Sequence, residues 1–226
     1  FDPNQEKATR ASLPDSLAFR HVSTIIETPD GVLWIGFFGE GLVRWDRENN
    51  NFQRFRNNPR DPYSLPQDYV LSLKSDVFGN LWVGTAYEVT RLNLSQQAFT
   101  LWPINIQDPG ARENSTYRMA EDRQGGIIVS STSALWYYEK LGAKPQPILV
   151  NGQKVAAPDF FTGTDSTVWT IIKGKLWIWN VKDRMFDPFK TPPLSGNILN
   201  VLVDRDDPQV LWLGTQNGLS RFDRRS

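Results

Sequence analysis

A short apolar segment recurs five times along the chain, and four of its copies carry a tryptophan at the same place. The anchor positions of these copies are Trp34, Trp82, Ile128, Trp169 and Trp212. They lie 48, 46, 41 and 43 residues apart. Turn residues follow each anchor, and then a second segment in which apolar and polar positions alternate. Alternation with a period of two predicts β-strands.

Other positions recur in phase with the anchor. Gly31, Gly79 and Gly125 stand three residues before it, where a tight turn leads into the anchor strand. Asp76 and Asp122 stand six residues before it. A looser strand follows the second segment in four units, at residues 52–55, 99–102, 147–150 and 186–189. Each unit therefore predicts four short strands and no helix, and a period of roughly 40–50 residues is typical of a propeller blade.

A single four-stranded sheet cannot cover its own two faces, so such units must pack on one another. Arrangement around a ring buries both faces of every sheet. We therefore predict an all-β fold, a β-propeller of four-stranded antiparallel blades, as one domain over residues 1–226. The five blades are expected at about residues 15–60, 61–110, 111–155, 156–195 and 196–226. The anchor tryptophans are expected to be mostly buried between blades.

Two segments carry a resemblance to a known family. Residues 76–85 read Asp-x-x-Gly-Asn-Leu-Trp-Val-Gly-Thr, and residues 211–223 begin Leu-Trp-Leu-Gly-Thr. Both resemble the two-component regulator propeller repeat, and the resemblance extends over essentially the whole chain. It implies the extracytoplasmic sensor of a membrane-bound signalling protein, with a hybrid histidine kinase or a diguanylate cyclase as output. The resemblance also implies a periplasmic location, and sensors of this family commonly form rings of seven blades.

The two ends of the chain share one phase of the repeat. Phe1-Asp2 matches Phe222-Asp223, so an N-terminal outer strand is predicted at residues 4–11. In a closed ring of five blades, residues 8–11 would pair with the strand at 219–222. The alternative is a fragment of a seven-blade sensor, in which that pairing is absent. The repeat pattern is compatible with both, and we favour the fragment.

Composition excludes several classes of site. The 25 basic and 25 acidic residues give zero net charge, which argues against a nucleic-acid binder. No apolar run approaches the roughly 18 residues of a membrane span, so no membrane insertion by this segment is predicted. The chain has no cysteine, and His21 is its single histidine. We predict no catalytic residue, no metal and no cofactor, and we interpret the acidic run at 204–208 as an exposed turn rather than a calcium site.

The mouth of the central channel is the expected place for a ligand. The candidates lie on loops that enter the innermost strands and on turns between the middle strands. Phe37-Phe38 stands where other units have Gly-Thr and carries one extra residue in the turn. Rings beside charged groups suit a small polar molecule such as a carbohydrate. The candidate ligand-binding residues are Arg20, His21, Phe37, Phe38, Tyr69, Tyr87, Tyr117, Arg118 and Phe160.

Two functions remain open at this point. The first is a sensor module that binds a small molecule and relays the signal to an attached or neighbouring domain. The alternative is a scaffold for protein–protein interaction or for a homodimer, with no small ligand. An enzyme is not predicted, since propellers host many functions and this sequence shows no base positioned beside a nucleophile.

Overall fold

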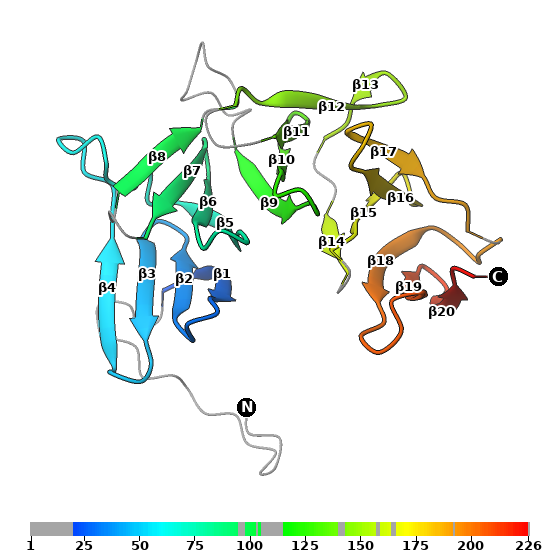
Figure 1. The fold of residues 1–226 in the computed structure, drawn as a ribbon, viewed down its shortest axis with the longest axis horizontal. Coiled ribbons are helices and arrows are strands. Elements are labelled where there is room, and N and C mark those ends of the chain that lie inside the picture. Colours follow the sequence, from blue (N-terminus) through cyan, green and yellow to red (C-terminus); the bar gives the residue numbers. More distant parts are fainter. Residues whose placement is uncertain are drawn as a thin grey trace.

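The computed structural model describes residues 20–94, 98–102, 104, 115–139, 143–156, 159–163, 166–191 and 193–225. Every regular element within these ranges is a β-strand. The strands form five antiparallel sheets that follow one another along an arc (Figure 1). The described part of the chain contains no helix long and apolar enough to cross a membrane.

Each sheet is built from consecutive strands. The first contains β1 (Val22–Glu27), β2 (Leu33–Phe37), β3 (Gly41–Asp46) and β4 (Asn51–Phe55). The second contains β5 (Val70–Ser75), β6 (Leu81–Thr85), β7 (Val89–Asn93) and β8 (Ala98–Trp102). The third contains β9 (Thr116–Glu121), β10 (Ile127–Ser131), β11 (Leu135–Tyr138), β12 (Gln146–Val150) and β13 (Gln153–Lys154). The fourth contains β14 (Phe160–Thr162), β15 (Val168–Ile172), β16 (Lys175–Asn180) and β17 (Met185–Pro188). The fifth contains β18 (Ile198–Val203), β19 (Val210–Thr215) and β20 (Gly218–Asp223).

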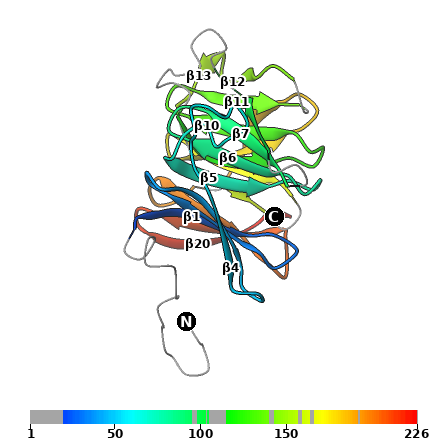
Figure 2. The same cartoon turned by 90° about the vertical axis from the view of Figure 1, so that its left-hand side faces the viewer.

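In each sheet, consecutive strands follow one another from the centre of the arc to its periphery. The innermost strands pack side by side in the order β1, β5, β9, β14 and β18, and the fourth strands β4, β8, β12 and β17 lie at the periphery (Figure 1, Figure 2). This arrangement confirms the predicted all-β propeller. The strand predicted at 4–11, and its pairing with residues 219–222, lie outside the described residues.

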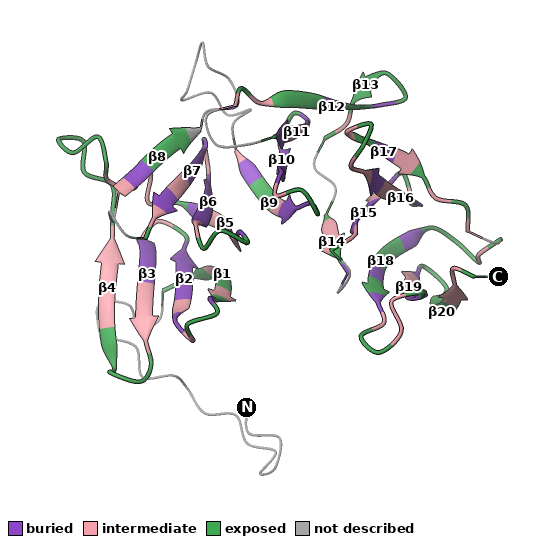
Figure 3. Cartoon of the chain, in the orientation of Figure 1, coloured by how far each residue is buried: buried purple, intermediate pink, exposed green. Residues whose placement is uncertain are grey.

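The five predicted anchor segments are the second strands of the five sheets, β2, β6, β10, β15 and β19. Buried residues concentrate on the middle strands, where neighbouring sheets face each other (Figure 3). Trp34, Trp82 and Trp169 are buried as expected. Trp212 is only partly buried, contrary to the prediction. It lies on the last sheet of the arc, whose outer face is not covered by any of the other four sheets.

The aspartates that precede the anchors accept hydrogen bonds from indole N–H groups. In the second sheet, Trp82 Nε1 donates to Asp76 Oδ2 at 2.8 Å. In the third sheet the anchor is Ile128, and Asp122 Oδ2 instead accepts from Trp179 Nε1 of the fourth sheet at 3.0 Å. The third sheet thus retains the aspartate although its anchor has no indole, and the indole of Trp179 in the fourth sheet is the donor instead.

One strand was not predicted. β13 is a two-residue strand that pairs with β12 through Val150 and Gln153. The turn between them is Asn151-Gly152, with φ angles of 51° and 74°. Two successive residues with positive φ form the type I′ turn that joins strands of a tight hairpin, and Asn-Gly is its commonest sequence.

Candidate functional site

The loops that enter the innermost strands and the turns that join the second and third strands lie at the same end of all five sheets. In the first sheet, Val22 at the start of β1 pairs with Phe37 at the end of β2. We call this end the mouth, defined by the turns at residues 38–40, 86–88, 132–134, 173–174 and 216–217. The nine residues proposed from the sequence all lie there, either in these turns, in the loops that enter the innermost strands, or near strand ends.

Three aromatic side chains form a continuous group at the mouth, between the first and second sheets. The ring centroids of His21 and Phe38 are 5.5 Å apart, and those of Phe38 and Tyr69 are 5.0 Å apart in an edge-on arrangement. The backbone N–H of Phe38 donates to the carbonyl oxygen of His21, and Phe38 forms an isolated β-bridge with Tyr69. Phe38 is 50% exposed and Tyr69 is 43% exposed. These three residues, the aromatic patch, therefore present fixed rings to solvent.

The length of the turn explains why Phe38 projects. Five residues separate the paired Gly36 and Leu42, whereas four separate Gly84 and Val89 in the second sheet. The extra residue lets the turn of the first sheet reach towards the loop that enters β5. Phe38 is carried out of the sheet by this turn.

The loop before β5 holds that turn in place. The N–H groups of Gly39 and Gly41 both donate to the carbonyl oxygen of Asp68, at 3.1 and 2.9 Å. Gly41 has a φ of 82°, and a Cβ atom there would lie 2.3 Å from the carbonyl oxygen of Phe55. Only glycine fits this position without a shift of the backbone.

Charged side chains surround the same turn. The Glu40 carboxylate is hydrogen-bonded by Arg54 and lies within 3.5 Å of Arg20 and 3.7 Å of Arg56. Arg56 also pairs with Asp68 at 2.8 Å, and this hydrogen bond raises the pKa of the guanidinium. Arg20, a predicted ligand residue, is therefore engaged with Glu40 in this structure.

A second group of the predicted residues joins the third and fourth sheets. Arg118 Nε lies 3.1 Å from Asp159 Oδ1, and the neighbouring Tyr117 is exposed on β9. Phe160 is partly buried and stacks on Phe186 with a centroid distance of 6.1 Å. Within the described ranges, no ring contact connects this group to the aromatic patch.

Two further predicted residues, Phe37 and Tyr87, are less exposed than the rings of the aromatic patch. Phe37 is wholly buried and packs with Ile35 and Val43, so its side chain does not contact a ligand at the mouth. Tyr87 is partly buried in the β6–β7 turn. Its neighbour Glu88 is buried, and desolvation raises the pKa of its carboxyl group to about 7. The sequence did not indicate this burial, because a glutamate in a turn is ordinarily solvated.

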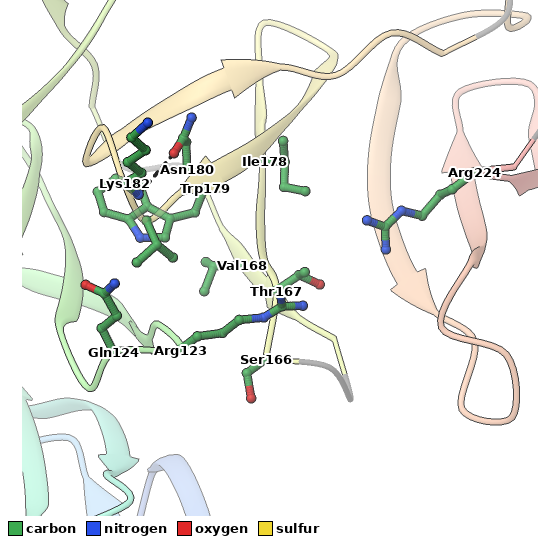
Figure 4. Close-up of a pocket in the computed structure, with 11 residues that line it drawn as sticks. Arg123, Gln124, Ser166, Thr167, Val168, Ile178, Trp179, Asn180, Lys182 and Arg224 are labelled. Carbon is green, nitrogen blue, oxygen red and sulfur yellow. Dashed lines mark hydrogen bonds between the residues drawn. The ribbon is translucent and has the colours of Figure 1, made fainter.

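A cleft of about 460 Å³ lies at the end opposite the mouth (Figure 4). Arg123 from the β9–β10 turn, Lys182 from the β16–β17 turn and Arg224 after β20 contribute to it, and none of its described lining residues is acidic. Its positive lining favours anionic groups. Sequence reasoning missed it because its residues come from turns of three different sheets. The lining residues are Arg123, Gln124, Ser166, Thr167, Val168, Ile178, Trp179, Asn180, Val181, Lys182 and Arg224.

The family comparison identifies one repeat. Residues 64–87 match the family model described as two component regulator propeller. The match covers β5 and β6 and includes Tyr69 of the aromatic patch. It confirms the resemblance stated for the second unit.

Similar proteins are longer than this chain. Histidine kinase P4 of Formosa agariphila is 26% identical over 99 residues, which cover 42% of this chain and 7% of that protein. The extracellular domain of the hybrid two-component system BT3049 from B. thetaiotaomicron superposes with a TM-score of 0.67 at 21% identity. That superposition covers 90% of this chain and 27% of the other.

An enzyme has a similar fold. Virginiamycin B lyase from Staphylococcus aureus superposes with a TM-score of 0.64 at 16% identity, over 90% of this chain and 70% of the lyase. Similarity at these identities concerns the fold alone. The chain is therefore an all-β propeller that carries a two-component regulator propeller repeat at residues 64–87.

Proposed function

We propose that this chain is a sensor module of an extracytoplasmic signalling protein, and that the aromatic patch recognises a small polar molecule such as a carbohydrate. The observation that carries the proposal is the group of three solvent-open rings beside the charged cluster around Glu40. A sugar presents an apolar face to such rings and hydroxyl groups to neighbouring charged side chains. Because the patch joins two sheets, a bound ligand would change how those sheets are held together.

The signalling part of the proposal has separate support. The matched repeat contains Tyr69, and similar proteins are a histidine kinase and a hybrid two-component system. For this chain, we propose an attached kinase or cyclase output domain and a periplasmic location. We also propose that it binds its ligand without catalysing a reaction.

Ligand binding can be tested with the chain in hand. A thermal-shift screen against neutral mono- and disaccharides should find compounds that raise the melting temperature, because a ligand of the folded state stabilises it in proportion to occupancy. Calorimetry should then show that Phe38→Ala and Tyr69→Ala each weaken binding about five- to tenfold, as expected for the loss of one stacking ring.

Two control variants locate the site. Tyr63→Ala removes an exposed ring outside the patch and should leave affinity unchanged. Lys182→Gln changes the basic cleft at the opposite end and should also leave it unchanged. Full affinity in both patch variants, or the absence of any stabilising saccharide, would overturn the assignment of the patch.

A second candidate function is an interaction scaffold, and one observation favours it. The outer face of the fifth sheet exposes Leu202 and Leu219 beside the partly buried Trp212. Leu202 and Trp212 are paired in register, so they share this face. A second copy of the chain covering it would give a dimer that Leu219→Glu disrupts. Sedimentation over a range of concentrations separates the two functions, since a monomer throughout excludes the dimer.

A further inference from the structure

We infer that a second binding site lies between the second and third sheets, at the end opposite the mouth, and that it takes a small monocarboxylate with an apolar body. A pocket of about 390 Å³ occupies this position, here called the carboxylate pocket. Its walls come from the β5–β6 turn, β6, β7, the β9–β10 turn, β10 and the end of the third sheet's β11. The lining residues are Asp76, Phe78, Asn80, Trp82, Arg91, Gln124, Gly125, Ile127, Tyr138 and Glu139.

The walls of this pocket are mainly apolar. Trp82 and Tyr138 are buried, their ring centroids are 6.4 Å apart, and Ile127 is buried in the same cluster. Phe78 is 75% exposed, yet its ring reaches the next sheet, where a Cβ atom on Gly125 would lie 3.0 Å from it. Phe78 therefore lies beside the entrance with one face available to a ligand.

The repeat does not require an aromatic residue at that turn. Phe78 stands four residues before its anchor, where the first unit has Asp30 and the third has Gln124. Val77 beside it is also exposed, although its N–H is held by Glu121 Oε1 at 3.1 Å. Exposed apolar side chains at a position that is polar in these other units indicate contact with another molecule.

Arg91 supplies the polar group of the pocket. Its Nε is buried and has no hydrogen-bond partner. The only hydrogen bond of its guanidinium to a described residue runs from Nη1 to Asn80 Oδ1, at 3.5 Å. The edge formed by Nε and Nη2 is the one that binds a carboxylate through two parallel hydrogen bonds, and here it carries none. A buried donor without an acceptor is unfavourable, so a carboxylate that docks on Nη2 would also satisfy Nε after a small rotation of the guanidinium.

The two acidic residues of the lining set the charge of the ligand. Asp76 Oδ2 accepts from Trp82 Nε1 at 2.8 Å, and Asp76 Oδ1 accepts from the N–H of Asn80 at 2.8 Å. Glu139 is held by both terminal nitrogens of Arg184, at 2.6 and 3.2 Å. Both carboxylates therefore have partners already, which argues against a cationic ligand. Their negative charge also disfavours a dianion such as phosphate, because Arg91 is the one cation among the described lining residues.

Phenylacetate and hexanoate are suitable probes, with phenylacetamide as the uncharged analogue. Ligand-observed NMR and calorimetry should show phenylacetate binding at least about tenfold more tightly than phenylacetamide, because only the carboxylate carries a negative charge and two oxygens that accept parallel hydrogen bonds from Arg91. Arg91→Gln should abolish this preference. Arg44→Gln is the matched control, because Arg44 pairs with Trp34 in the same register in which Arg91 pairs with Trp82.

Two further variants make the test decisive. Phe78→Ser alters an exposed side chain, so the protein should fold normally and lose affinity for phenylacetate several-fold. Phe38→Ala at the mouth should leave phenylacetate binding unchanged, which separates this site from the aromatic patch. Equal binding of acid and amide, equal losses in Arg91→Gln and Arg44→Gln, or no binding at millimolar concentration would each overturn the inference.

Discussion

Asp122 is a buried carboxylate that connects the third sheet to the fourth. Its Oδ1 accepts the backbone N–H groups of Gln124 and Gly126, both at 2.9 Å. Its Oδ2 accepts the Tyr137 hydroxyl and the Trp179 indole N–H, both at 3.0 Å. One oxygen therefore holds the β9–β10 turn, and the other holds two aromatic side chains between the sheets.

The two oxygens can be tested separately. Asp122→Ala leaves the buried Tyr137 hydroxyl and Trp179 N–H without their acceptor, at about 1–3 kcal/mol each, and the loss of the turn hydrogen bonds adds a smaller cost. We therefore expect a total loss of roughly 3–5 kcal/mol. Asp122→Asn keeps an oxygen for the turn but places an NH₂ group opposite the Trp179 N–H. Tyr137 can accept from that NH₂ group, whereas Trp179 cannot, so the expected loss is about 1–3 kcal/mol.

Urea unfolding followed by tryptophan fluorescence measures both losses. Asp46→Ala is the control, because Asp46 accepts from Asn49 in an exposed turn and its removal should cost about 1 kcal/mol or less. An Asp122→Asn variant as stable as the wild type would refute the assigned role of Oδ2. So would an Asp46→Ala variant that loses as much stability as Asp122→Ala.

Two further predictions concern the mouth. Burial raises the pKa of Glu88 from 4.5 to about 7, so the folded protein binds more protons than the unfolded chain between these values. Stability should therefore fall as pH rises from about 5 to about 7, and Glu88→Gln should flatten this slope in a series of melting curves; an unchanged slope contradicts the assignment. Gly41→Ala should cost about 1–3 kcal/mol because of its φ of 82° and its contact with the Phe55 carbonyl. Gly31→Ala, at a φ of 77° with no atom within 4 Å, should cost less in the same urea assay, and equal costs would show that the contact is unimportant.

The repeat could be predicted because its signals are local. An apolar segment identified the second strand of every sheet, and in the first three sheets a glycine turn at a fixed distance supported it, including β10, where the anchor is Ile128. The fourth strands were found in the same way, from short alternating segments such as β4. Strand identity depends on side-chain alternation within a few residues, which the sequence displays directly.

Contacts between sheets were harder to predict. Nothing in the neighbourhood of Trp179 indicates that its N–H reaches Asp122, 57 residues earlier. Phe37 and Phe38 are adjacent and chemically identical, yet one is buried and the other is exposed. Successive residues of a strand face opposite sides, so the last strand residue and the first turn residue separate. The hairpin at Asn151-Gly152 has a local signal, because Asn-Gly is the commonest sequence of a type I′ turn.

The uncovered face of the fifth sheet leads to a last prediction. Trp82 and Trp212 occupy the same repeat position, and each donates its indole N–H to an aspartate at 2.8 Å, Asp76 or Asp204. They differ in burial, because the third sheet covers Trp82 and no described sheet covers Trp212. A comparison of the two tryptophans therefore separates the contribution of packing between sheets to stability from that of the hydrogen bond.

Trp82→Ala should cost about 3–5 kcal/mol, as for a large residue in a core, and Trp212→Ala about 1–2 kcal/mol. The third strands show a similar difference between a covered sheet and the last one. Leu42 pairs with Gly36 in the first sheet and is 0% exposed, whereas Leu219 pairs with Gly214 in the fifth sheet and is 71% exposed. Urea unfolding at two protein concentrations measures the costs. Equal costs at both concentrations would refute the claim that this face is uncovered in the isolated chain. A cost for Trp212→Ala that grows with concentration would instead mean that a second copy covers the face, because only association makes stability depend on protein concentration.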